Sequence, residues 1–105
     1  METVRISPEE LFIIKSAFKK HFSNTDHLWI FGSRTDPKRR GGDLDFYIET
    51  PEIDFELILK RKSAFVSELW DKIGEQKIDV VINLINKPAD LAIYKEAQKT
   101  GVKLV

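Results

Sequence analysis

The sequence predicts one small α/β (α+β) domain, in which a small mixed β-sheet has helices packed on one of its faces. The 105 residues suffice for a single domain spanning 1–105, and 42% apolar with 32% charged residues is an ordinary globular composition. Helical patterns alternate with short apolar runs in the order α-β-β-α-β-α, and a short strand is expected at the C-terminus. Helices that alternate with strands favour a sheet covered by helices.

The first helix has a clear start signal. Ser7 is the expected N-cap, Pro8 suits the first helical position, and Glu10 completes a capping box. One apolar face follows at helical spacing and consists of Leu11, Ile14, Phe18 and Phe22. We expect this helix to end near Ser23 and Asn24.

Three strands and two further helices follow. Strands are expected over "HLWIFG" (27–32), "DLDFYIE" (43–49) and "KIDVVINLI" (77–85), because apolar and β-branched residues dominate these runs. The helix between the last two strands carries an apolar stripe from Phe55 to Leu69 that Lys62 alone interrupts, and Gly74 can terminate it. Pro88 is expected to open the last helix and Gly101 to close it.

Composition excludes several kinds of function. There is no cysteine, so the chain has neither disulfides nor zinc–thiolate sites nor a cysteine nucleophile. The 17 basic and 17 acidic residues cancel, which leaves no global attraction to nucleic acid. The N-terminus lacks an apolar signal core, and no apolar run approaches the roughly 20 residues of a membrane span. A cytoplasmic protein without a membrane contact is therefore expected.

Two aspartates stand inside the second strand, although Asp is a poor strand former. Period-two geometry places Asp43 and Asp45 on the same face, and Asp79 can join them if the third strand lies beside the second. Three converging carboxylates repel one another unless cations hold them, and oxygen-only ligands suit Mg²⁺. The alternative is that these side chains lie on a solvated face.

The segment "GSR", Gly32 to Arg34, ends the first strand. If a helical turn begins there, its free N–H groups can bind a phosphate, and glycine permits a close approach of the backbone. Ser33 can add a hydroxyl donor and Arg34 a charge. A Gly-Ser pair alone is a weak signal, but one that shortly precedes an Asp-x-Asp strand is specific.

"GSR" followed by "GGDLDFYI" and later by "KIDVVI" resembles the minimal nucleotidyltransferases of the DNA polymerase β-like superfamily, over nearly the whole chain. The resemblance implies a palm-like nucleotidyltransferase fold. It also implies that Asp43, Asp45 and Asp79 bind two Mg²⁺ or Mn²⁺ ions, and that Gly32, Ser33 and Arg34 hold the triphosphate of an NTP, ATP above all. The chain departs from the family pattern in Thr35, Asp36 and Pro37 and in Gly42, which leaves the metal triad intact.

The resemblance further implies transfer of AMP to a hydroxyl of a protein or RNA acceptor. Such domains are often paired with a helical HEPN-domain protein, the nucleotidyltransferase being the antitoxin of a HEPN toxin. A non-catalytic antitoxin that neutralises its partner by contact is the alternative. A nucleic-acid-binding module fits less well, because no aromatic and basic residues are interleaved.

Overall fold

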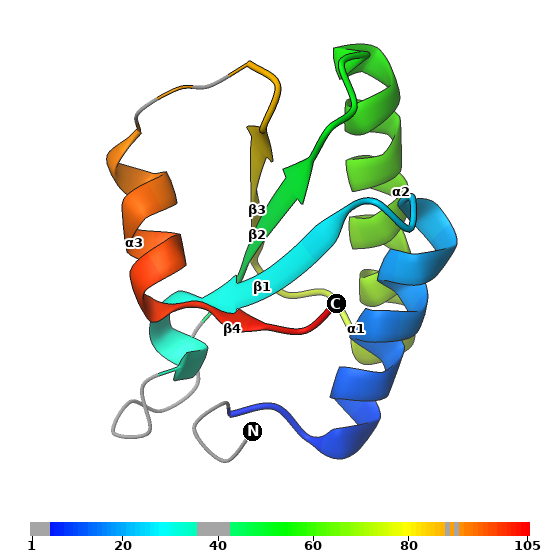
Figure 1. Ribbon diagram of the computed structural model, residues 1–105. Coiled ribbons are helices and arrows are strands. Elements are labelled where there is room, and N and C mark those ends of the chain that lie inside the picture. The colour runs from blue at the N-terminus through cyan, green and yellow to red at the C-terminus, as the bar shows by residue number, and fades with distance from the viewer. Residues whose placement is uncertain (1–4, 36–42, 88, 90) are drawn as a thin grey trace.

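A computed structural model describes residues 5–35, 43–87, 89 and 91–105 (Figure 1). The elements in these ranges are α1 (Pro8–His21), β1 (His27–Phe31), the 3-10 helix η1 (Gly32–Thr35), β2 (Leu44–Thr50), α2 (Phe55–Ile73), β3 (Ile78–Leu84), α3 (Ala92–Thr100) and β4 (Val102–Lys103). Their order is the one predicted from the sequence. No described helix is long and apolar enough to cross a bilayer.

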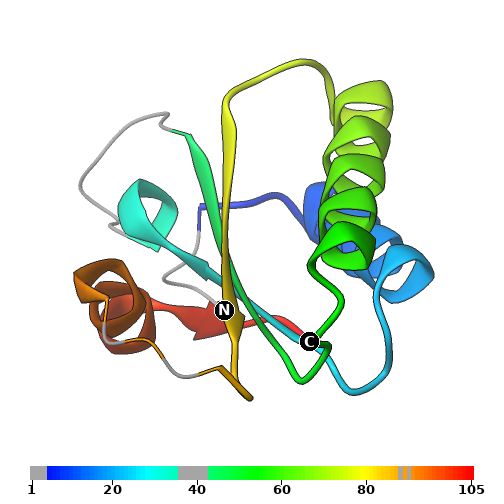
Figure 2. The same ribbon diagram turned by 90° about the horizontal axis from the view of Figure 1, so that it is seen from above.

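The strands form a mixed sheet in the order β3-β2-β1-β4 (Figure 2). β1 pairs antiparallel with both β2 and β4, whereas β2 and β3 are parallel. A parallel pair needs a crossover connection, which α2 supplies. The predicted α/β (α+β) class with a small mixed sheet is therefore confirmed.

α1 begins with the predicted capping box. The N–H of Glu10 donates to the Ser7 hydroxyl at 3.1 Å, and the N–H of Ser7 donates to the Glu10 carboxylate at 3.2 Å. The helix ends at His21, slightly earlier than predicted. The reason is the next turn, in which the N–H of Ser23 donates to Oδ2 of Asp26 at 2.9 Å instead of continuing the helix.

α1 and α2 cover one face of the sheet and form the main core with it. Leu44, Phe46 and Ile48 of β2 point into this core, as the alternation of the strand predicts. Phe65 of α2 is fully buried at its centre. Its ring meets those of Phe18, Phe22 and Phe46 at steep angles, with centroid distances of 6.0, 6.0 and 5.5 Å.

α3 lies on the opposite face (Figure 1), so the expectation that all helices share one face was wrong. The reason is that the strands carry large apolar side chains on this face too. Phe31, Tyr47 and Ala97 are buried there together. The buried Tyr47 hydroxyl accepts hydrogen bonds from Asn83 at 2.9 Å and Gln98 at 3.1 Å and donates to Glu49 at 2.8 Å.

α3 begins at Ala92, later than the predicted start at Pro88. Leu91 is the N-cap residue and has an extended backbone with no side-chain cap. Pro88 itself lies outside the described residues. The predicted end at Gly101 is confirmed, since the N–H of Gly101 makes the last helical hydrogen bond, to Ala97.

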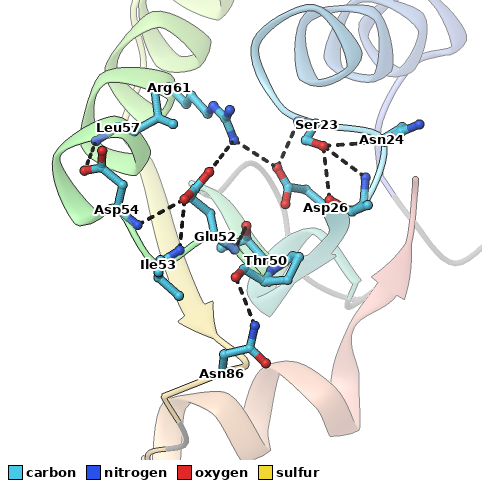
Figure 3. A network of polar contacts seen from close by, with 12 residues as sticks. Ser23, Asn24, Asp26, Thr50, Glu52, Ile53, Asp54, Leu57, Arg61 and Asn86 are labelled. Atoms are coloured by element: carbon cyan, nitrogen blue, oxygen red, sulfur yellow. Dashed lines mark hydrogen bonds and ion pairs between the residues drawn. The ribbon is translucent and has the colours of Figure 1, made fainter.

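A polar network ties the start of β1 to the end of β2 and to α2 (Figure 3). Nη1 of Arg61 lies 3.7 Å from Oδ2 of the buried Asp26 and 4.0 Å from Oε1 of Glu52. Asn86 donates to the carbonyl of Pro51 at 3.0 Å and joins the end of β3 to the same region. The network lies at the end of β1 away from Gly32.

Glu68 joins α1 to α2 through three cationic side chains. Its carboxylate lies 2.8 Å from Nε2 of His21 and 3.3 Å from Nζ of both Lys20 and Lys72. The hydrogen bond with His21 is the main cause that lowers the pKa of Glu68 to about 2, and the two lysines act in the same direction.

This carboxylate should make folding stability depend on pH in the acid range. Because the pKa of Glu68 is lower in the folded state than its ordinary 4.5, its contribution is complete above pH 4.5 and is lost as the pH falls towards 2. We expect Glu68→Gln to lower the melting temperature at pH 6 and to reduce the loss of stability on acidification. Glu75→Gln, at an exposed position, is the control. Wild-type and Glu68→Gln curves that stay parallel from pH 6 to pH 2.5 would contradict this assignment.

Candidate active site

A cavity of about 610 Å³ lies where β1 ends and where β2 and β3 begin, and residues of both α2 and α3 contribute to its lining. Gly32, Asp43, Asp45 and Asp79 all line it. The antiparallel β1–β2 pair and the parallel β2–β3 pair bring these three strand ends to the same edge. The convergence of the three predicted aspartates with the predicted glycine is thus seen in the structure.

The three carboxylates differ in their exposure. Asp45 and Asp79 are direct register partners in the β2–β3 pair, and the charge of Asp79 acts on Asp45. Asp43 immediately precedes β2. Its side chain is 47% exposed and that of Asp79 52% exposed, whereas Asp45 is the innermost of the three.

The pKa of Asp45 is raised above its ordinary value. Burial is the main cause, followed by the charges of Asp79 and Asp43, while Lys77 acts in the opposite direction. Ionisation of Asp45 is therefore less favourable than that of a free aspartate, and added positive charge beside it would favour the ionised form.

Glycine is required at position 32 by the backbone conformation there and by the neighbouring side chain of Asp45. Its φ of +78° lies in the left-handed region, and a Cβ built on it would overlap Oδ2 of Asp45 and lie 3.2 Å from its Cγ. The residue opens η1, a turn whose Thr35 hydroxyl donates to the carbonyl of Gly32 at 2.7 Å. The expected helical turn after β1 is thus present, and its first residue is in contact with the innermost carboxylate.

Gly32→Ala should destabilise the fold by about 1–3 kcal/mol, because strain at a positive φ is combined with the overlap on Asp45. Gly74→Ala is the matched control: Gly74 has a φ of +92°, but an added Cβ there would meet nothing within 4 Å. Urea unfolding of the two variants should show the larger loss for Gly32→Ala. Asp45→Ala in the Gly32→Ala background should recover the difference. Equal losses in the two single variants would refute the contact.

Lys77 is a site residue that the sequence analysis missed. Its ammonium lies 3.5 Å from Oδ2 of Asp43 and 3.9 Å from Oδ2 of Asp79, and its side chain is 68% exposed. The signal was present, because Lys77 precedes Asp79 by two positions and therefore lies on the same side of the chain. It supplies positive charge to the carboxylates in this conformation.

Lys62 and Glu96 also line the cavity. Lys62 is the residue that interrupts the apolar stripe of α2, and this interruption was its only signal in the sequence. It reaches the cavity beside Ile78 and Val80, at the outer side of β3. Glu96 comes from α3, whose position on this face was not predicted.

Arg34 does not line the cavity in the described part of the chain. Its guanidinium donates to the carbonyl of Arg5 at 2.8 Å, and its own carbonyl accepts from the N–H of Arg5 at 2.8 Å. Arg34 thus holds the segment that precedes α1. Ser33 lies in η1, but its side chain is outside the part that the structure describes.

Among the described residues, no group of three or more His, Cys, Asp or Glu side chains is arranged to hold a metal ion as it stands. Two of the acidic residues of the cavity, Asp43 and Asp79, are instead bridged by Lys77. Because Lys77 is largely exposed, it can leave without disturbing the core.

Comparisons with protein-family models and with curated proteins give no match to this chain.

Proposed function

We propose that the protein is a metal-dependent nucleotidyltransferase that moves a nucleoside monophosphate, AMP from ATP, to an acceptor hydroxyl. The observation that carries this proposal is the contact between Gly32 and Asp45 in a cavity that Asp43 and Asp79 also line. It joins a positive-φ turn, suited to phosphate, to a set of carboxylates suited to hard cations.

The donor set fits a magnesium or manganese centre in its chemistry. Asp43, Asp45 and Asp79 offer only oxygen atoms, and the raised pKa of Asp45 marks a place where added positive charge is favourable. Lys77 would leave the carboxylates when the cations and the triphosphate bind. Bound Mg²⁺ or Mn²⁺ would supply charge neutralisation at the transferring phosphoryl group and activation of the attacking oxygen.

The residues of the chain would position the reactants. The turn that starts at Gly32 would hold the outer phosphates through its backbone N–H groups, and Lys62 at the cavity wall would add positive charge. The acceptor oxygen would form a bond to the α-phosphorus while the bond to pyrophosphate breaks. We assign the hydroxyl proton to the carboxylate of Asp79, which is 52% exposed and open to an acceptor. Positioning and electrostatic stabilisation would account for most of the rate.

The acceptor is proposed to belong to a macromolecule, either RNA or a protein, with a helical HEPN-domain protein as the first candidate. This part of the proposal rests on the resemblance of "GSR", "GGDLDFYI" and "KIDVVI" to minimal nucleotidyltransferases. In that case the chain would act as the antitoxin of a toxin–antitoxin pair in the cytoplasm.

Mg²⁺ or Mn²⁺ together with ATP should raise the melting temperature more than metal alone. A ligand that binds only the folded state stabilises it by about 2.7 kcal/mol at 100 times its dissociation constant. The scan should be paired with a transfer assay using ATP labelled in the α-phosphate and the product of a neighbouring gene. If millimolar metal and ATP leave the melting temperature unchanged and no labelled nucleotide is transferred, the proposal that the protein is an enzyme is wrong. A shift without transfer would favour a binding module.

A further inference from the structure

The outer edge of β3 is free within the described part of the chain. β3 is the end strand of the sheet and has β2 as its one neighbour there. In Figure 2, α2 and α3 lie to the two sides of β3, and neither they nor any described loop crosses its outer edge. The strand is seven residues long and reads IDVVINL. It carries no proline or lysine, and Asp79 is its one charged residue among those that protect edge strands from pairing.

The backbone direction of β3 can be read from the hydrogen bonds at its ends. The carbonyl of Lys77 accepts from the N–H of Leu44 at 3.2 Å, and the N–H of Ile85 donates to the carbonyl of Thr50 at 3.0 Å. Odd-numbered residues therefore direct their peptide groups towards β2. Because successive residues alternate, the N–H and C=O groups of Ile78, Val80, Ile82 and Leu84 point outward.

Exposed apolar side chains flank this edge on both faces of the sheet. Phe55 and Leu59 of α2 are 55% and 43% exposed, and they lie on the same side of the helix as Lys62, which contacts the cavity beside β3. On the other face, Ile93 of α3 is 38% exposed and lines the cavity together with Val81. Large apolar side chains exposed beside an unpaired strand edge favour a protein contact there.

We propose that this edge, with Phe55 and Leu59 beside it, pairs with the same edge of a second copy of the chain. The two β3 strands run antiparallel about a twofold axis at Val81. Ile78 then forms a hydrogen-bonded pair with Leu84, and Val80 forms one with Ile82. All outward peptide groups of the strand are satisfied in this register, and apolar side chains oppose apolar side chains on the α2 face.

Charge selects the same register. With the axis at Val81, each Asp79 stands opposite an Asn83 of the second copy, which is a carboxylate opposite an amide. Moving the axis to Val80 or to Ile82 sets Asp79 opposite an apolar residue and leaves an outward peptide group of the strand unpaired. The net charge of zero adds no long-range repulsion between copies. An isologous contact of this kind is the usual symmetry of a dimer.

The dimer contributes to the acidic cavity. Asp79 lines the cavity at the outer strand of the sheet, so Asn83 of the second copy is placed at its border. Each cavity would thus have a wall from both chains. The pairing does not depend on the proposed reaction, and it applies equally if the chain binds without catalysis.

Sedimentation equilibrium tests the dimer. Wild-type protein at tens of micromolar should have twice the chain mass of 12.2 kDa. Leu59→Glu, which places carboxylates beside the axis, should give a monomer. Phe12→Glu is the control, and this variant should remain a dimer. Phe12 is 72% exposed, and it lies on α1, which β1, β2 and α2 separate from β3 along the chain. A monomeric wild-type protein, or equal dissociation by both variants, would overturn the proposal.

Cysteine cross-linking tests the register, because the chain has no cysteine of its own. Directly opposed residues of a non-hydrogen-bonded pair have Cα atoms about 4.5 Å apart, within the range of a disulfide. Val81→Cys should therefore form a disulfide-linked dimer under mild oxidation. Asn83→Cys, which faces Asp79 rather than itself, should form little. Two outcomes would overturn this register: Asn83→Cys cross-links as efficiently as Val81→Cys, or neither variant cross-links.

Discussion

Replacement of Asp45 by asparagine is expected to slow the proposed nucleotidyl transfer by about 100-fold or more, which corresponds to roughly 2.7 kcal/mol of transition-state stabilisation. Asn keeps the size of the side chain and its contact with Gly32, but it removes the innermost charge of the carboxylate set. Transfer of labelled AMP under saturating metal and ATP measures the effect. Asp71→Asn, at an exposed position on α2, is the matched control and should leave transfer unchanged.

The same substitution should behave differently in a stability assay without metal. The pKa of Asp45 is raised in the folded state, so the ionised carboxylate lowers stability as the pH rises through this pKa. At pH 7, Asp45→Asn should therefore be as stable as the wild-type protein or slightly more stable. A clear loss of melting temperature would assign Asp45 a structural role instead. Loss of transfer with retained partner neutralisation in cells would favour the non-catalytic antitoxin.

Phe65→Ala is expected to have the largest effect on stability, about 3–5 kcal/mol. The side chain is fully buried, and it contacts aromatic rings from α1 and β2 at once. A loss of this size approaches the whole stability of a small domain, roughly 5–15 kcal/mol. Urea unfolding at 25 °C measures it.

Phe12→Ala is the control for this prediction, because the same side chain is removed from a position that is 72% exposed. Its effect should stay within about 0.5 kcal/mol. Similar losses for the two variants would show that Phe65 does not hold α1, α2 and the sheet together in the way described.

Local sequence signals predicted most of the fold. The box formed by Ser7 and Glu10 and the end of α2 at Gly74 are local features, and the structure contains both. The predicted stripe of α2 is buried at Ile58, Phe65 and Leu69, whereas its members Phe55 and Leu59 are exposed. The side on which α3 packs could not be predicted in the same way. It depends on apolar side chains such as Trp29 and Tyr47, which lie on the second face of the sheet and were separated from α3 in the sequence.

The candidate site was predicted in part. Asp43, Asp45 and Asp79 meet because β3 pairs with β2. The sequence analysis predicted this meeting only on the condition that the two strands are neighbours. Lys62 and Glu96 come from helices on opposite faces, so their arrival at the cavity depends on tertiary packing and not on a motif. The role of Arg34 at a phosphate stays a prediction, and in this structure its guanidinium donates to the carbonyl of Arg5.

The alternation of apolar and acidic side chains along β2 determines where Asp45 is placed. Leu44, Phe46 and Ile48 enter the core, while Asp45 faces the cavity from the same strand. A slip of one residue in pairing would bury carboxylates among aromatic rings and move the core residues to the α3 face, beside the cavity. The slipped pairing is therefore strongly disfavoured. Burial of the apolar side chains on one face of β2 thus fixes the position of Asp45 in the cavity on the other face.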